Sequence, residues 1–346
     1  MKIPYVNLVL QWEKERKFLL PLIKKTLEKG EYVGGKQISI FEKNISKVCG
    51  TKYAVGLNSG TDALTLGLIL LGVRKGDEVI TPPNSFISST SSIIHIGARP
   101  VFVDVLPDQN INPELIERSI TKKTKAIMPV HLTGRIAEMK EIMRISKKYG
   151  IPVLEDAAQS IGSKYYQKKS GSFGDIGCFS GHPLKNLNAY GDSGFITTDN
   201  ELFYKKAISM RNHGLVDRNK VNNFGFLSRL DVLQAVILNH RIRNLNQTIS
   251  KRRKNAKFYL KNLNRKKFFL IDEKKYQFNT YHTFVIQTDK RDKLKKYLSK
   301  NGIGTAIHYP VPIHLQPAAK YLGYKKGSFP NTEKQSRQIL TLPIHQ

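Results

Sequence analysis

The chain contains little cysteine and no long apolar segment. Its two thiols, Cys49 and Cys178, give neither a disulfide framework nor the closely spaced ligands of a metal site. The longest apolar run, residues 64–73, is interrupted by glycine and threonine and is far shorter than the ~20 residues that a membrane span needs. The N-terminus lacks the apolar core of a secretory signal. We therefore expect a cytoplasmic protein with no membrane segment and no bound metal.

Acidic residues are also scarce relative to basic ones. The 346 residues include 57 Lys plus Arg against 27 Asp plus Glu, a formal net charge of +30. The basic residues are spread along the chain, and the densest cluster, residues 250–257, lies in a helical pattern without interleaved aromatic residues. The chain carries no nucleic-acid-binding motif. We interpret the charge as a lysine-rich surface that suits an anionic substrate and expect no nucleic-acid partner.

Short apolar runs alternate with helical patterns from about residue 54 to residue 200. Several runs, such as 101–103, are apolar on both faces, which is typical of strands buried in a parallel sheet. This alternation predicts an α/β domain with a mixed, mostly parallel sheet of seven strands, preceded by helices at 12–28 and 38–48. The expected strands are 54–57, 78–81, 100–105, 125–130, 152–155, 176–179 and 194–197, and the expected helices between them include 61–71, 112–120 and 136–149.

A second, smaller unit is expected after a long helical stretch at 230–263. Strand patterns at 280–287 and 302–309 flank a helical pattern at 291–300, which together predict an α+β unit. We place the boundary near residue 245. The predicted domains are 1–245, with the N-terminal helices and the large sheet, and 246–346.

Lys185 follows the predicted strand 176–179 and lies in a turn with nearby glycines. An amine held in a cavity at this position can condense with an aldehyde, and pyridoxal phosphate is the obvious aldehyde. In a chain with 57 basic residues, a lysine chosen at random is a solvated surface charge. Lys185 is therefore a cofactor candidate only if the rest of a cofactor site follows other strands, where ligands bind in open α/β sheets.

Two strand ends supply groups for a phosphate. The first predicted strand leads into Gly60 and Thr61, where free amides at the start of a helix form an anion site, although a plain helix cap gives the same pattern. Ser180, at the end of another strand, can add a hydroxyl.

Two further strand ends supply groups for an aromatic ring. Glu155 and Asp156 end a buried strand, and the Asp156 carboxylate can keep a pyridine nitrogen protonated. Glu155 is expected to face the opposite side and to serve structure. Gln159 can reach a ring oxygen. Phe86 can stack on the ring, with a core phenylalanine as the alternative.

The ordered motifs of this chain resemble one family over nearly its whole length. They are NSGTDAL (58–64), GDEVITPP (76–83), PVHL (129–132), EDAAQ (155–159), KNL (185–187) and HYPVPIHLQP (308–317). This set is similar to the DegT/StrS-type sugar aminotransferases, which are fold type I pyridoxal phosphate enzymes acting on nucleotide-linked keto sugars. The resemblance implies a homodimer with sites at the subunit interface, glutamate as the amino donor, and amino sugars for surface polysaccharide or glycoconjugate synthesis.

The resemblance also implies roles for residues. Lys185 forms the covalent bond to the cofactor, Asp156 faces the pyridine nitrogen and Gln159 the ring hydroxyl. Phe86 stacks on the ring, while Gly60, Thr61 and Ser180 hold the phosphate. The candidates for substrate contact are His182, His308 and Tyr309, with structural histidines as the alternative, and Arg229, which would reach the nucleotide diphosphate of the neighbouring subunit.

Three features depart from the family pattern. Leu227 stands where the family carries an asparagine that reaches the partner's cofactor phosphate, and Gly181 stands where an aromatic residue is usual. The chain is also expected to be short at its C-terminus.

These departures leave alternatives open. A dehydratase of the same family is one, although such enzymes replace the lysine at position 185 with histidine. A non-enzymatic, degenerate homologue is another. The segment 185–194 favours amination at the sugar's C3 over C4.

Overall fold

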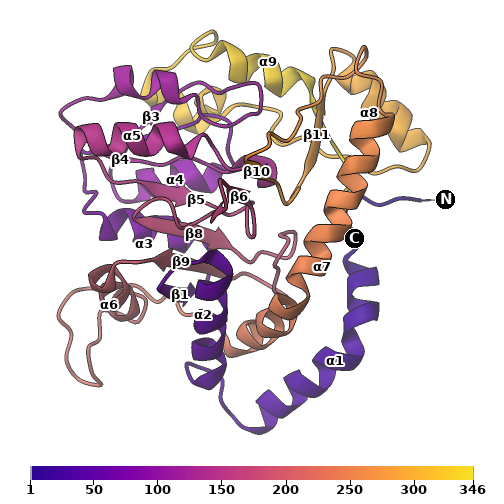
Figure 1. Ribbon diagram of the computed structural model, residues 1–346. Helices are drawn as coiled ribbons and strands as arrows, with labels where there is room; N and C mark the ends of the chain where they lie inside the picture. The colour runs from indigo at the N-terminus through magenta and orange to yellow at the C-terminus, as the bar shows by residue number, and fades with distance from the viewer. Residues whose placement is uncertain (1, 346) are drawn as a thin grey trace.

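The centre of the molecule is a mixed sheet, seen in a computed structural model that describes residues 2–345 (Figure 1). Three strands are hydrogen-bonded in the order β3-β2-β4 and four in the order β1-β9-β8-β5, and parallel bridges from Ile127 to Val153 and from Val130 to Asp156 connect β4 with β5. β9 is antiparallel to both of its neighbours, while the other pairs are parallel. The α/β class is thus confirmed. The strands are β1 (Tyr53–Leu57), β2 (Glu78–Thr81), β3 (Arg99–Phe102), β4 (Thr124–Ile127), β5 (Leu154–Asp156), β8 (Ile176–Ser180) and β9 (Gly194–Thr198).

Helices cover both faces of this sheet because its strands are apolar on both sides. Leu154 packs in one core cluster with α3 (Gly60–Leu70), whereas its neighbour Val153 packs in another with α5 (Met139–Tyr149). α3 approaches closely at Gly67, where a Cβ atom would lie 2.6 Å from Leu154 Cδ1. The remaining helices of this unit are α1 (Leu8–Glu28), α2 (Lys36–Cys49), α4 (Ile87–His95) and α6 (Glu201–Met210).

Two expected elements are wrong. The helix at 112–120 is a pair of 3-10 turns, η1 (Pro113–Leu115) and η2 (Glu117–Ser119), although Leu115, Ile116 and Ile120 pack on the core as expected. The strand at 302–309 is absent from the described residues because this segment changes partner: Ile303 pairs with Ile3, and Ala306 pairs with Thr341.

The long helix α7 (Val232–Asn262) runs from the large unit into the small one, so the predicted boundary at residue 245 falls within a helix (Figure 1). In the small unit, β11 (Phe284–Gln287) pairs antiparallel with β12 (Ile339–Leu342). Its other elements are α8 (Arg291–Lys300), η4 (Ile313–Leu315), η5 (Pro317–Leu322) and α9 (Pro330–Gln338). The short strands β6 (Lys164–Tyr165), β7 (Lys168–Lys169) and β10 (Gln277–Phe278) form a third, separate sheet.

Two absences can be stated for residues 2–345. None of the helices in this range is both long and apolar enough to cross a membrane. The same range brings together no group of three or more histidine, cysteine or acidic side chains that could hold a metal ion.

Candidate active site

A cavity of about 310 Å³ opens where β1, β5 and β8 end. It brings together ten of the eleven residues expected from the sequence, which come from segments far apart in the chain. These residues are Gly60, Thr61, Phe86, Asp156, Gln159, Ser180, His182, Lys185, His308 and Tyr309.

Lys185 stands on a loop that the surrounding structure holds in place. Its backbone N–H donates to His182 O (2.8 Å), and the next side chain, Asn186, donates to Thr280 O (3.1 Å). Burial lowers the pKa of Lys185 to about 8, and the nearby Asp156 carboxylate opposes this shift. An appreciable fraction of the amine is therefore neutral near pH 7, and the neutral amine is the form that attacks an aldehyde.

Asp156 ends β5 and is only 5% exposed. Its carboxylate accepts hydrogen bonds from Ser89 Oγ (2.6 Å) and from Ala158 N–H (3.2 Å). Burial raises the pKa of this carboxyl, whereas the Ser89 hydrogen bond and the charge of Lys185 lower it. A cationic group entering the cavity would remove the cost of burying this charge, so the site suits a protonated ring nitrogen.

The start of α3 lies against the end of β8. Ser59 caps the helix by accepting a hydrogen bond from Asp62 N–H (3.0 Å), and Gly60 begins it. A Cβ atom on Gly60 would lie 2.7 Å from Ser180 Cβ, so glycine is required for this approach. Thr61 Oγ1 donates to Ser88 Oγ (2.9 Å). The free amides at the start of α3, together with the hydroxyls of Thr61, Ser88 and Ser180, form a site that suits a phosphate.

Aromatic rings form one wall of the cavity. Phe86 is 54% exposed, so it is not a core residue, and its ring centroid lies 6.0 Å from that of Tyr309. The wall continues to His308, whose ring lies 5.4 Å from Tyr309, edge to face. Burial and the Lys185 charge lower the pKa of His308 to about 4, so its ring is neutral at pH 7. The Nδ1 atom of His308 lies 3.0 Å from Thr341 Oγ1.

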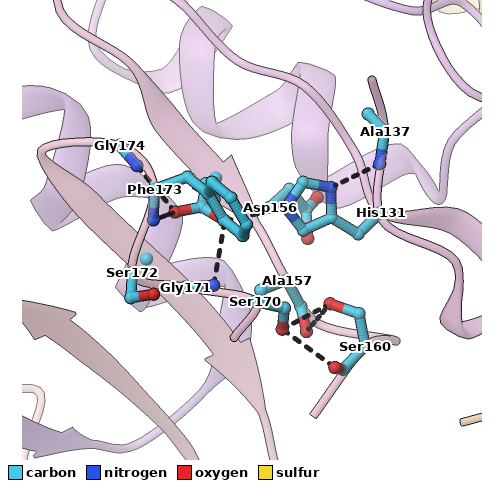
Figure 2. A network of polar contacts seen from close by, with 12 residues as sticks. His131, Ala137, Asp156, Ala157, Ser160, Ser170, Gly171, Ser172, Phe173 and Gly174 are labelled. Atoms are coloured by element: carbon cyan, nitrogen blue, oxygen red, sulfur yellow. Dashed lines mark hydrogen bonds and ion pairs between the residues drawn. The ribbon is translucent and has the colours of Figure 1, made fainter. Parts of the chain in front are cut away.

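Glu155 does not line the cavity that Asp156 lines, which agrees with the sequence prediction that the two side chains face opposite sides of β5. Figure 2 shows His131, Gly171, Phe173 and Gly174, the residues that contact Glu155. Glu155 is fully buried and accepts hydrogen bonds from the backbone of Gly171 (2.9 Å), Phe173 (2.6 Å) and Gly174 (2.8 Å). His131 Nε2 lies 2.8 Å from the same carboxylate. Because His131 Nδ1 accepts from Ala137 N–H (3.3 Å), its ring proton lies on Nε2. Glu155 therefore has a structural role.

The sequence interpretation missed several lining residues, among them Tyr5, Ser89, Arg252 and His282. Arg252 belongs to the basic cluster 250–257 that was assigned to the surface, and for this residue the assignment is wrong. Its side chain is 6% exposed, and Nη1 donates to the carbonyls of Tyr281 (3.3 Å) and His282 (3.0 Å). Helical spacing could have revealed it, because the residues three before and four after it are buried apolar residues.

Arg229 lies outside this cavity. It lines a neighbouring hollow of about 450 Å³ together with Leu227, and Nη1 donates to Asn212 Oδ1 (3.2 Å). Asp192 lines both spaces. The expected contact of Arg229 with a ligand of a neighbouring subunit stays a prediction.

The cavity fits pyridoxal phosphate by its chemistry. It combines an anion site at Gly60, a carboxylate at Asp156, an exposed aromatic face at Phe86 and a partly neutral amine at Lys185. Each of these groups matches one part of that cofactor: phosphate, ring nitrogen, ring face and aldehyde.

Known proteins are similar to this chain in sequence and in fold. The chain is 38% identical over 344 residues to the UDP-N-acetyl-3-dehydro-alpha-D-glucosamine 3-aminotransferase of Acidithiobacillus ferrooxidans, covering 99% of this chain and 92% of the relative. The crystal structure of DesV from S. venezuelae, in complex with a ketimine intermediate, superposes with a TM-score of 0.96 at 35% identity, covering 99% and 93% of the two chains. NtdA from Bacillus subtilis, solved with bound cofactor PMP, gives a TM-score of 0.88 at 34% identity, covering 96% and 78%. A family model matches residues 13–346, and the chain belongs to the DegT/DnrJ/EryC1/StrS aminotransferase family.

Proposed function

We propose that this aminotransferase uses pyridoxal phosphate to convert a nucleotide-linked keto sugar into an amino sugar, with glutamate as the amino donor. The observation that carries the proposal is the pairing of Lys185, with a pKa of about 8, and the buried Asp156 in one cavity. The cofactor requires an amine that is partly neutral at pH 7, which attacks its aldehyde, and a buried carboxylate, which pairs with its ring nitrogen.

Four parts of the cavity would hold the cofactor. The start of α3 with Gly60, together with Ser180, would bind its phosphate, and Asp156 would keep its ring nitrogen protonated. Phe86 would cover one face of the ring, and Gln159 would lie near its hydroxyl. When bound, the cofactor withdraws electrons from the substrate carbon. Lys185 Nζ, in its neutral form, would remove the proton from that carbon and deliver it to the carbon that carried the cofactor's aldehyde oxygen.

The substrate side of the cavity carries neutral hydrogen-bonding groups. Burial lowers the pKa of both His182 and His308. Because Nδ1 of His182 accepts from Leu184 N–H and Nδ1 of His308 lies beside Thr341 Oγ1, each ring keeps its Nε2 atom for a ligand. Such groups suit sugar hydroxyls, and Tyr309 adds a phenol. The relative that aminates a UDP-linked 3-keto sugar supports C3 as the position of amination.

A homodimer with sites at the subunit interface completes the proposal. Apolar side chains are exposed around Arg229, including Leu227 at 57% and Phe224 at 97%. A surface of this kind is typical of an interface. Leucine at position 227 has no donor for a phosphate, so another group would have to supply this contact. A role in surface polysaccharide or glycoconjugate synthesis and a cytoplasmic location complete the proposal.

Two alternatives predict different behaviour. A sugar dehydratase of this family would carry histidine at position 185, and Lys185 disfavours it. A regulator without enzymatic activity would bind no cofactor. Leu227 motivates this second alternative, because it weakens the expected phosphate site.

The decisive experiment adds pyridoxal phosphate to the purified protein and records the near-visible absorbance. We expect a band from the bond to Lys185, its loss in Lys185→Ala, and its retention in the control Lys122→Ala, which changes an exposed lysine. A wild-type protein with no band would exclude the aminotransferase proposal. Glutamate with a panel of nucleotide-linked keto sugars would then identify the substrate by its aminated product.

A further inference from the structure

The N-terminal segment is tied across the small unit before α1 begins. We call residues 3–6 the N-terminal strap. Ile3 N–H donates to Gly302 O (2.8 Å), and Gly304 N–H donates to Ile3 O (2.8 Å). The two segments are so close that a Cβ atom on Gly304 would lie 2.6 Å from Tyr5 N. The start of the strap is therefore held by one parallel β-bridge between Ile3 and Ile303.

The strap is also fixed at its other end and from the C-terminal side. Asn7 caps α1 by accepting a hydrogen bond from Leu10 N–H (3.0 Å). His345 Nε2 lies 3.1 Å from Pro4 O. Between these ties, Tyr5 and Val6 line the Lys185 cavity. A segment held in this way can present a side chain to a ligand with little loss of conformational freedom on binding.

Tyr5 continues the aromatic wall away from the cofactor end. Its ring centroid lies 5.8 Å from that of His308, which leads through Tyr309 to Phe86. Phe86 is the ring expected at the cofactor, so Tyr5 lies three ring contacts away from it. Burial raises the pKa of Tyr5 to about 12, so the phenol keeps its proton at neutral pH and can both donate and accept.

We propose that Tyr5 is a specificity-determining residue that binds the sugar of the amino acceptor. An aromatic face packs well on the C–H groups of a sugar ring, and a phenol at its edge can hydrogen-bond a sugar hydroxyl. Glutamate has no ring face to pack on this side chain, so the amino donor should depend on Tyr5 less than the sugar does. This proposal rests on the proposed function, because the place of the cofactor defines which end of the wall is left for the sugar.

The two halves of the transamination test the proposal separately. In the first, glutamate alone is added to the loaded protein and the change in cofactor absorbance is followed. In the second, the keto sugar nucleotide is added to the aminated form. For Tyr5→Phe we expect an unchanged cofactor band, an unchanged first half and a roughly tenfold higher KM for the sugar, about the worth of one hydrogen bond. Tyr5→Ala should raise this KM further, with a smaller change in kcat.

Two further variants and a binding measurement complete the design. Tyr321→Phe removes a hydroxyl from an exposed tyrosine outside the cavity and should leave both halves unchanged. Gly304→Ala would displace the strap and should therefore raise the KM for the sugar, as Tyr5→Ala does. Calorimetric titration of the cofactor-free protein with the nucleotide sugar measures binding alone, because no turnover occurs. It should show that Tyr5→Phe binds the nucleotide sugar more weakly than the wild type does.

The proposal is overturned if Tyr5→Phe and Tyr5→Ala bind and use the sugar within twofold of the wild type. It is equally overturned if the glutamate half slows as much as the sugar half. Failure of the proposed function has a different signature, because the wild-type protein itself would then form no cofactor band. The calorimetric comparison tests Tyr5 in that case too.

Discussion

The two acidic residues that end β5 are adjacent in the sequence, but their carboxylates differ in how many hydrogen bonds they accept. Glu155, on one face of the strand, accepts three backbone N–H groups and the His131 side chain. Asp156, on the other face, accepts one serine hydroxyl and one nearby amide. A carboxylate whose lone pairs are all used holds the chain together. One with few partners is available to a ligand.

Glycines make the Glu155 side possible. The loop that donates to Glu155 contains Gly171, Phe173 and Gly174 (Figure 2). It approaches so closely that a Cβ atom on Gly171 would lie 2.4 Å from the Phe179 ring. A Cβ atom on Gly174 would lie 2.5 Å from Val153 O. The Glu155 face is thus filled by backbone, whereas the Asp156 face opens into the cavity.

The largest effect is expected from Glu155→Ala. Removing this carboxylate leaves three buried N–H groups and the His131 N–H without an acceptor, and should lower the free energy of unfolding by about 3–5 kcal/mol. Urea denaturation measures the change. Glu117→Ala, which removes a surface ion-pair partner, is the control and should leave the free energy of unfolding nearly unchanged, because water screens this ion pair. If Glu155→Ala and Glu117→Ala unfold at the same urea concentration, Glu155 does not have the structural role that distinguishes it from Asp156.

Asp156→Asn should have the reverse profile. We expect kcat to fall roughly 10²–10³-fold, since a preorganised charge opposite the cofactor ring is lost. The free energy of unfolding should not fall by more than about 1 kcal/mol, because the amide avoids the cost of a buried charge. Steady-state kinetics and denaturation on the same preparation give both values. A variant that unfolds as readily as Glu155→Ala would contradict the assignment of the two faces.

The pH dependence of cofactor loading reports on the Lys185 side. Because the protonated amine cannot attack and the pKa of Lys185 is about 8, the rate should rise about tenfold per pH unit below 8 and level off above it. Asp156 raises this pKa, so in Asp156→Asn the plateau should begin at a lower pH. Stopped-flow absorbance between pH 6 and 9 shows both. A plateau that does not move would mean that the two groups are uncoupled.

The smallest effect is expected from Ser89→Ala. The Ser89 hydroxyl lowers the pKa of Asp156, so its loss raises that pKa, and the acidic limb of the kcat profile should move to higher pH. At pH 7 we expect kcat to fall about tenfold or less, which corresponds to the contribution of one hydrogen bond. Ser91→Ala, on the same helix and outside the cavity, is the matched control. An unmoved acidic limb would show that Ser89 does not act through Asp156.

Most of the candidate site could be predicted because strand ends are visible in the sequence. Apolar runs locate Asp156 and Ser180 at strand ends, and parallel strands bring such ends to one edge. Tyr5 and Arg252 could not be found in this way, since they reach the cavity from the strap and from the middle of α7. Their positions depend on how the small unit packs against the sheet.

The sequence by itself determined the α/β class and the family and predicted the candidate cofactor residues around Lys185, because periodicity and local motifs follow the order of the chain. Only the tertiary structure decided that Tyr5 and Arg252 also line the cavity and how the pKa values of Lys185 and Asp156 are shifted. Desolvation lowers the pKa of Lys185 and raises that of Asp156, and a hydrogen bond from Ser89, a residue far from Asp156 in the sequence, opposes the second shift. Burial of this kind is a property of packing, which no local pattern encodes.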